Sequence, residues 1–115
     1  MYGIIAAMQE EMQEMKNIMQ EICEMQVYEL TFFVGKIYNN KVILVEAGVG
    51  KVNAARVTQI LIDKFEVKKI INIGSAASCN DKLEIGDIVI GSKLVQHDFD
   101  ITAFNHPKGY ISNIG

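Results

Sequence analysis

The sequence predicts an α/β fold, in which helices cover the faces of a central sheet. Short apolar runs rich in Ile and Val recur along the 115 residues, and segments with helical periodicity lie between them. Gly or Asn residues often bound the runs. Apolar residues make up 50% of the chain, which is enough to build the core of a small domain without disulfides or metal ions. We therefore expect a single domain over residues 1–115.

The first expected strand, Tyr2 to Ala7, precedes a predicted helix from Gln9 to Met25. At about 100° per residue, the apolar side chains of this helix gather on one arc, which should face the sheet. The arc consists of Met8, Met12, Met15, Ile18, Met19 and Ile22. Glu11 falls inside this arc, whereas Glu10 points almost directly away from it. We interpret most of the Met stripe as core and Met8, at the junction, as a candidate ligand contact.

Glu11 is the first candidate for acid/base chemistry. A carboxylate at the edge of an apolar face near a strand end is partly desolvated and suited to proton exchange. The alternative is that Glu11 reaches solvent in the first helical turn, where a negative charge complements the helix dipole. Periodicity alone leaves both interpretations open.

The middle of the chain should form another strand or hairpin arm, a buried strand and a helix. These elements cover Val27 to Tyr38, Lys41 to Ala47 and Lys51 to Phe65. The backbone N–H groups of the turn Gly48-Val49-Gly50-Lys51 could donate hydrogen bonds to an anion or a polar ligand. The alternative is that the turn is only a tight strand-to-helix connection. It is not a P-loop, because the glycine spacing is wrong and Val52 replaces the magnesium-binding Ser or Thr.

Two further buried strands are expected at Lys69 to Ile73 and Ile85 to Ile90. After the first of these, Gly74 permits close backbone approach and Ser75 has a hydroxyl where open α/β sheets bind ligands. The spacing is not that of a nucleophile elbow. Considered alone, Ser75 fits a turn residue as well as a ligand contact. His97, between strand and loop, is interpreted as structural, and Pro107 lies in a polar surface loop.

Composition excludes several classes of partner. The formal charge of -3 comes from 14 acidic and 11 basic residues that are well mixed, so we expect no nucleic-acid binding. No apolar run approaches the roughly 20 residues needed to cross a bilayer, and no secretory signal is recognisable. Cys23 and Cys79 lack the spacing of a disulfide framework or a zinc site, so we expect free thiols in a reducing cytoplasm.

Four motifs occur in one order: Glu10-Glu11, Gly48 to Ala55, Asn72 to Ala76 and His97 to Phe104. From Met1 to about Gly109 the chain resembles the bacterial 5'-methylthioadenosine/S-adenosylhomocysteine nucleosidases, which hydrolyse the bond between adenine and a thio-substituted ribose. The resemblance implies a three-layer nucleoside phosphorylase/hydrolase-like fold with a mixed central sheet, present as its amino-terminal half. It also implies a homodimer and a reaction that requires no metal or organic cofactor.

The resemblance also implies roles for individual residues. Glu11 matches the carboxylate that activates the attacking water, and Ser75 matches a serine beside that water and the ribose. Met8 and Val49 match residues that line the sugar and alkylthio region, and Ala76 and Ala77 match a segment beside the purine. Ile101 and Phe104 match hydrophobic residues that reach into the partner subunit's site in the family's homodimer.

The chain departs from the family pattern in two ways. Ala77-Ser78 replaces a Gly-Gly pair near the purine. The chain also stops before the family's ribose-binding glutamate and base-protonating aspartate. We therefore expect the polypeptide alone to be inactive and to leave apolar surface uncovered, unless a second chain supplies the missing half.

Two alternatives to the nucleosidase remain open at this stage. One is a nucleoside phosphorylase, against which the presence of a single arginine, Arg56, argues mildly, because phosphate binding calls for arginines. The other is a non-catalytic fragment that survives as a dimerising or nucleoside-binding module.

Overall fold

The computed structural model describes residues 1–111, which form two compact units divided between Ala77 and Ser78. The first unit contains five strands and two helices: β1 (Tyr2–Ala6), α1 (Gln9–Ile18), β2 (Gln20–Val27), β3 (Leu30–Ile37), β4 (Asn40–Glu46), α2 (Lys51–Phe65) and β5 (Lys69–Ile73). The described part of the second unit has one regular element, the short 3-10 helix η1 (Thr102–Phe104). None of the helices in residues 1–111 has the length and apolar character needed to cross a membrane.

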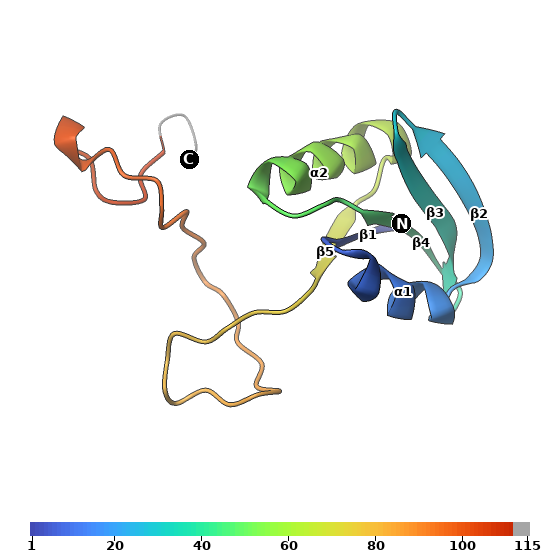
Figure 1. Cartoon of the computed structure of the whole chain (residues 1–115), viewed down its shortest axis with the longest axis horizontal. Helices are drawn as coiled ribbons and strands as arrows, with labels where there is room; N and C mark the ends of the chain where they lie inside the picture. The colour runs from blue at the N-terminus through green and yellow to red at the C-terminus, as the bar shows by residue number, and fades with distance from the viewer. Residues whose placement is uncertain (112–115) are drawn as a thin grey trace. The chain divides into compact units, whose positions relative to one another are not determined.

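The five strands form one mixed sheet in the order β2-β3-β4-β1-β5 (Figure 1). β1 is parallel to both β4 and β5, whereas β2, β3 and β4 are antiparallel to one another. At the end of β1, Ala6 lies opposite Glu46 of β4 and Ile73 of β5. The carboxyl ends of these three strands therefore meet at one edge of the sheet, which confirms the predicted mixed α/β sheet.

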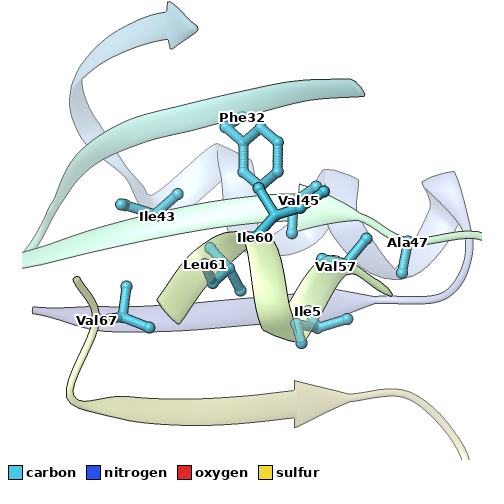
Figure 2. Packing of buried hydrophobic residues seen from close by; sticks show 9 residues of the cluster. All are labelled: Ile5, Phe32, Ile43, Val45, Ala47, Val57, Ile60, Leu61 and Val67. Carbon is cyan, nitrogen blue, oxygen red and sulfur yellow. The ribbon is translucent and has the colours of Figure 1, made fainter. Parts of the chain in front are cut away.

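Helices cover both faces of the sheet, with α1 on one face and α2 on the other (Figure 1). Because side chains alternate along a strand, neighbouring residues of β1 enter different cores. Ile5 packs in the α2 core, shown in Figure 2, with Phe32, Ile43, Val45, Ala47, Val57, Ile60, Leu61 and Val67. The α1 core consists of Ile4, Ala6, Met12, Met19, Phe33, Val42 and Leu44. Burial of both faces explains the nearly continuous apolar sequence of β1 and β4.

The predicted helix from Gln9 to Met25 is wrong in its second half. Met19 has extended backbone angles, φ −78° and ψ 147°, and ends α1. Gln20–Val27 then forms β2, which pairs antiparallel with β3 and shifts register between Gln20 and Cys23. Ile22 therefore lies on a strand rather than on the helix arc. Hydrogen bonding to β3 outweighs a helical periodicity that the flexible Met residues only weakly specify.

Tight turns join the three antiparallel strands. Val27 pairs with Leu30 across Tyr28-Glu29, so β3 confirms the strand predicted between Val27 and Tyr38. Ile37 pairs with Asn40 across the next turn, in which both Tyr38 and Asn39 have positive φ, 49° and 69°. Two consecutive positive φ angles are the signature of a type I′ turn, whose twist matches that of the flanking strands.

Two of the expected buried strands differ in the structure. Lys69 to Ile73 forms β5, but among residues 1–111 this strand pairs only with β1, and Ile70 and Ile71 are exposed. Ile85 to Ile90 forms no strand, and Ile85, Ile88 and Ile90 are almost fully exposed. An apolar run specifies where a strand could form, but the strand itself requires a neighbour to complete its backbone hydrogen bonds, and this segment has none among residues 1–111.

Candidate active site

An open groove of about 670 Å³ lies where β1 and β5 end and runs along α1 as far as its last residue, Ile18. Its lining combines two carboxylates, a hydroxyl and apolar side chains: Met8, Glu11, Glu14, Met15, Ile18, Ile73, Gly74 and Ser75. A mostly apolar concave surface with a few polar groups at the carboxyl ends of parallel strands is the usual form of a small-molecule site.

Glu11 is fixed at the strand-to-helix junction. Its Oε2 accepts the backbone N–H of Ala7 at 2.9 Å and that of Met8 at 3.1 Å. Glu11 is the third residue of α1, so its carboxylate satisfies N–H groups that the start of a helix leaves unpaired, and its charge opposes the positive end of the helix dipole. Glu11 is half-buried whereas Glu10 is exposed. The side chain thus folds back into the groove instead of simply extending into solvent.

The other oxygen of the same carboxylate faces β5. A Cβ placed on Gly74 would lie 3.2 Å from Glu11 Oε1 and 3.6 Å from Cδ. The carboxylate therefore bridges the ends of two adjacent strands, and Ser75 follows directly in the groove lining. A carboxylate and a hydroxyl in one groove can orient a water molecule, and the carboxylate can accept a proton from it.

The Met stripe of α1 is divided between two environments. Met12 and Met19 are buried in the α1 core, whereas Met8 and Met15 line the groove. Met8 is 43% exposed, so its thioether is accessible to a ligand. Sequence reasoning singled out Met8 but missed Glu14, whose three-residue spacing from Glu11 places both carboxylates on one helix face.

The glycine turn after β4 has the geometry of a tight connection. Gly48 and Gly50 have positive φ, 85° and 106°, and Asn53 Nδ2 donates to the carbonyl oxygen of Val49 at 2.9 Å. These angles explain the two glycines without any ligand. Val49 is 71% exposed and does not line the groove, although its loop follows β4 at the same sheet edge.

The other predicted site residues lie outside the groove lining. Ala76 and Ala77 are exposed directly after Ser75. Ile101 and Phe104 belong to the second unit, where Phe104 is exposed at the end of η1. Within that unit, Asp100 Oδ1 accepts the N–H of Thr102 at 2.9 Å. This backbone hydrogen bond, together with a bond from the Thr102 side chain, holds the pKa of Asp100 below its ordinary value.

Within the described chain, no three His, Cys, Asp or Glu side chains are arranged to hold a metal ion. Cys23 and Cys79 are free and exposed. The chemistry visible in the groove is therefore that of Glu11, Glu14 and Ser75.

A family model described as the phosphorylase superfamily matches residues 1–114. This chain belongs to the phosphorylase superfamily. Among curated proteins, this superfamily member is 42% identical over 111 residues to the 5'-methylthioadenosine/S-adenosylhomocysteine nucleosidase of Staphylococcus haemolyticus, which covers 96% of this chain and 49% of that protein. The nucleosidase of a Marinomonas species is 40% identical over 112 residues, and the match covers 97% of this chain and 48% of that protein.

Solved structures give the same picture. The nucleosidase of Colwellia psychrerythraea in complex with adenine superposes with a TM-score of 0.89 at 38% identity, covering 96% of this chain and 46% of that one. A futalosine hydrolase mutant of Helicobacter pylori superposes with a TM-score of 0.87 at 32% identity, covering 98% and 50%. The phosphorylase superfamily member described here thus spans about half the length of the relatives it matches.

Proposed function

We propose that this chain contributes the water-activating half of a nucleosidase that hydrolyses 5'-methylthioadenosine and S-adenosylhomocysteine and releases adenine. The proposal is carried by one observation: the Glu11 carboxylate is anchored by two backbone N–H groups and borders an open groove with Ser75. The names of the most similar relatives support the substrate class.

In the proposed reaction, a water molecule in the groove attacks the anomeric carbon of the ribose. The bond between this carbon and the adenine nitrogen breaks through an oxocarbenium-like transition state, and the bonding electron pair leaves with adenine. Glu11 takes one proton from the water and later releases it to solvent, while the hydroxyl group of the water stays on the sugar. The departing adenine nitrogen takes its proton from a general acid that further sequence would supply. Ser75 would position the water and the ribose hydroxyls, so this half of the site acts through orientation and proton acceptance.

We assign the remaining predicted residues to substrate contacts. Met8, exposed in the groove, would contact the sugar and its alkylthio group together with Val49. Ala76 and Ala77 would lie beside the purine. The second unit presents exposed apolar side chains, including Phe104, that would reach the site of the other subunit in a homodimer.

A polypeptide of these 115 residues should need further sequence for turnover. The chain spans about half the length of its nucleosidase relatives, and the groove has no group positioned to protonate adenine among its eight lining residues apart from the two glutamates. We therefore propose that residues corresponding to the other half, in the same or a second chain, complete a homodimeric enzyme. The two exposed free thiols are compatible with a reducing cytoplasm.

The proposal can be tested with a chimera. This chain would replace the segment that it matches in the Staphylococcus haemolyticus nucleosidase, to which it is 42% identical. Adenine release from 5'-methylthioadenosine, S-adenosylhomocysteine and futalosine would be measured for the chimera and for the isolated chain. We expect the chimera to release adenine from the two thio-nucleosides and the isolated chain to be inactive. A folded chimera without activity would contradict the assignment.

A phosphorylase activity is the second candidate, because the matching family is named for that reaction. Arg56, the only arginine in the chain, pairs through its guanidinium with the Glu29 carboxylate beside the β2–β3 turn and does not line the groove, which argues against a role in binding phosphate there. A backbone hydrogen bond and this guanidinium hold the pKa of Glu29 below its ordinary value, so the partner stays charged. Hydrolysis predicts that the chimera works without phosphate and forms free sugar, whereas phosphorolysis would require phosphate and form a sugar phosphate.

A non-catalytic dimerising or nucleoside-binding module is the third candidate. Its support is the outer edge of β5, which has no strand partner in the described part of the chain and leaves Ile70 and Ile71 exposed. Adenine nucleoside binding by a chimera that never turns over would favour this candidate.

A further inference from the structure

The two oxygens of the Glu11 carboxylate have different surroundings. Oε2 accepts two backbone N–H groups from the β1–α1 junction, at 2.9 Å and 3.1 Å. Oε1 is the atom closest to the position that a Gly74 side chain would occupy. One oxygen is thus held by the backbone, and the other is directed along the groove toward the end of β5.

Gly74 adjoins the backbone that holds Oε2. Ala6 and Ile73 are opposite each other in the β1–β5 pair, so the next residues are Ala7, which donates to Oε2, and Gly74. Gly74 is not among the glycines with positive φ, so its backbone does not require glycine. Glycine is favoured here by the limited space beside the carboxylate. A Cβ would lie 3.2 Å from Oε1, so the neighbouring atom would have to move by a few tenths of an ångström.

We infer that Gly74 is a positioning residue for Glu11: its lack of a side chain sets the place of Oε1, the oxygen left free to accept a proton. An added methyl group would meet the end of a flexible side chain rather than backbone, so the chain should fold but the carboxylate should shift. The shift would weaken the two hydrogen bonds to Oε2. The structural part of the inference stands on geometry, and only its catalytic consequence rests on the proposed function.

The structural part is tested on the 115-residue chain itself by NMR. Solvent exchange of the Ala7 and Met8 amide hydrogens would be measured in the native chain, in Gly74→Ala, in Glu11→Ala and in the double variant. Gly91→Ala is the matched control, because the same methyl group there meets only Leu94 Cδ2 at 3.9 Å and the backbone has no positive φ. We expect Gly74→Ala to speed exchange of both amides on the order of tenfold, the loss of a hydrogen bond to a charged group, and Gly91→Ala to leave them unchanged.

The double variant separates the carboxylate from other effects. If Gly74 acts through Glu11, then Gly74→Ala adds no further change once Glu11 is Ala. Unchanged amide exchange in Gly74→Ala, or an equal effect with and without the carboxylate, would overturn the inference.

The catalytic consequence is measured in the chimera. We expect Gly74→Ala to lower kcat about tenfold, as a small misplacement of a catalytic group does, with KM nearly unchanged. An equal kcat for both chimeras would overturn this consequence. An inactive native-sequence chimera would instead refute the proposed function, while the amide exchange would still decide whether Gly74 positions Glu11.

Discussion

Glu11 combines a structural contact at the start of α1 with a position in the groove lining. Its carboxylate completes the hydrogen bonds at the start of α1 and at the same time borders the groove. The adjacent Glu10 has neither role and is exposed. Helical periodicity distinguishes these two residues in advance, because a rotation of about 100° turns one toward the sheet and the other toward solvent.

Other residues of the site were less predictable. Met8 and Ser75 line the groove as their positions after β1 and β5 suggest, since the carboxyl ends of parallel strands meet at one edge. Glu14 was not predicted, because it lies one turn further from the strand end than Glu11 and is exposed. The proximity of Gly74 to the Glu11 carboxylate could not be predicted, because it depends on the register of two strands that are far apart in the sequence.

Acidification should loosen the turn before η1. The N–H of Thr102 binds the charged form of Asp100, which lowers the pKa of this carboxyl below its ordinary value of 3.8. A lowered pKa means that the bond contributes stability above pH 3.8 and loses it as the pH falls through the lowered value. We expect an NMR titration to give Asp100 a pKa below 3.8, and the amide resonance of Thr102 to shift over the same pH range.

Replacement of Thr102 by proline, which removes the N–H, should return the Asp100 pKa toward its ordinary value. A pKa at or above 3.8 in the unmodified chain would contradict this prediction.

At the scale of elements, tertiary hydrogen bonding overruled local patterns twice. Gln20–Val27 continues the Met and Ile periodicity of α1 but becomes β2, because β3 offers it a ladder of backbone partners. The segment from Ile85 to Ile90 is richer in Ile and Val than Gln20–Val27, but it forms no strand, because no partner strand lies beside it among the described residues. α2 and β1 were predicted almost to the residue. The helical periodicity of α2 and the continuous apolar run of β1 both agree with the packing that these elements have in the structure.

A substitution in the β3–β4 turn should stabilise the chain. Tyr38 has a φ of 49°, which is unfavourable for a bulky residue, and its side chain is 90% exposed, so little packing is at stake. Asn is favoured at this position of a type I′ turn, so we expect Tyr38→Asn to stabilise the chain by about 0.5 to 1 kcal/mol in urea unfolding.

A β-branched residue at the same position provides the opposite case. Tyr38→Val should destabilise the chain, because Val enters the left-handed region least readily. Equal unfolding midpoints for these two variants would show that the turn does not limit stability.

The packing of α2 on the sheet is tested by two adjacent residues. Leu61 is fully buried in the α2 core (Figure 2). The next residue, Ile62, is 45% exposed. Leu61→Ala should lower the free energy of unfolding by about 2 to 5 kcal/mol, because it removes buried methyl groups and leaves a cavity. Ile62→Ala removes a comparable volume from the surface and should cost much less. Similar losses for both variants in urea unfolding would contradict the assignment of the core.

At the scale of the whole molecule, the fold class was predictable and the completeness of the sheet was not. Alternating apolar and helical segments predict a sheet with helices on both faces, and the first unit has this arrangement (Figure 1). The sheet has an open edge at β5, whose apolar residues Ile70 and Ile71 remain exposed. Among residues 1–111 the outer edge of β5 has no strand partner, and the chain spans about half the length of its nucleosidase relatives.

The expected single domain over residues 1–115 stays a prediction. The first unit, residues 1–77, contains the sheet and the groove, and the second, from residue 78, contains Ile101 and Phe104. The groove itself is formed by the first unit alone. The proposed water activation by Glu11 can therefore be tested separately from the proposed roles of Ile101 and Phe104.

The central claim is that Glu11 activates water for hydrolysis of the bond between adenine and ribose. Its most direct test compares adenine release from 5'-methylthioadenosine by the chimera with that of its E11Q variant, with E10Q as the matched control. Gln keeps an oxygen that can accept the Ala7 and Met8 N–H groups but cannot take a proton from water, so we expect kcat to fall about 10²- to 10⁴-fold while E10Q stays fully active. Equal rates for the chimera and E11Q would contradict the account.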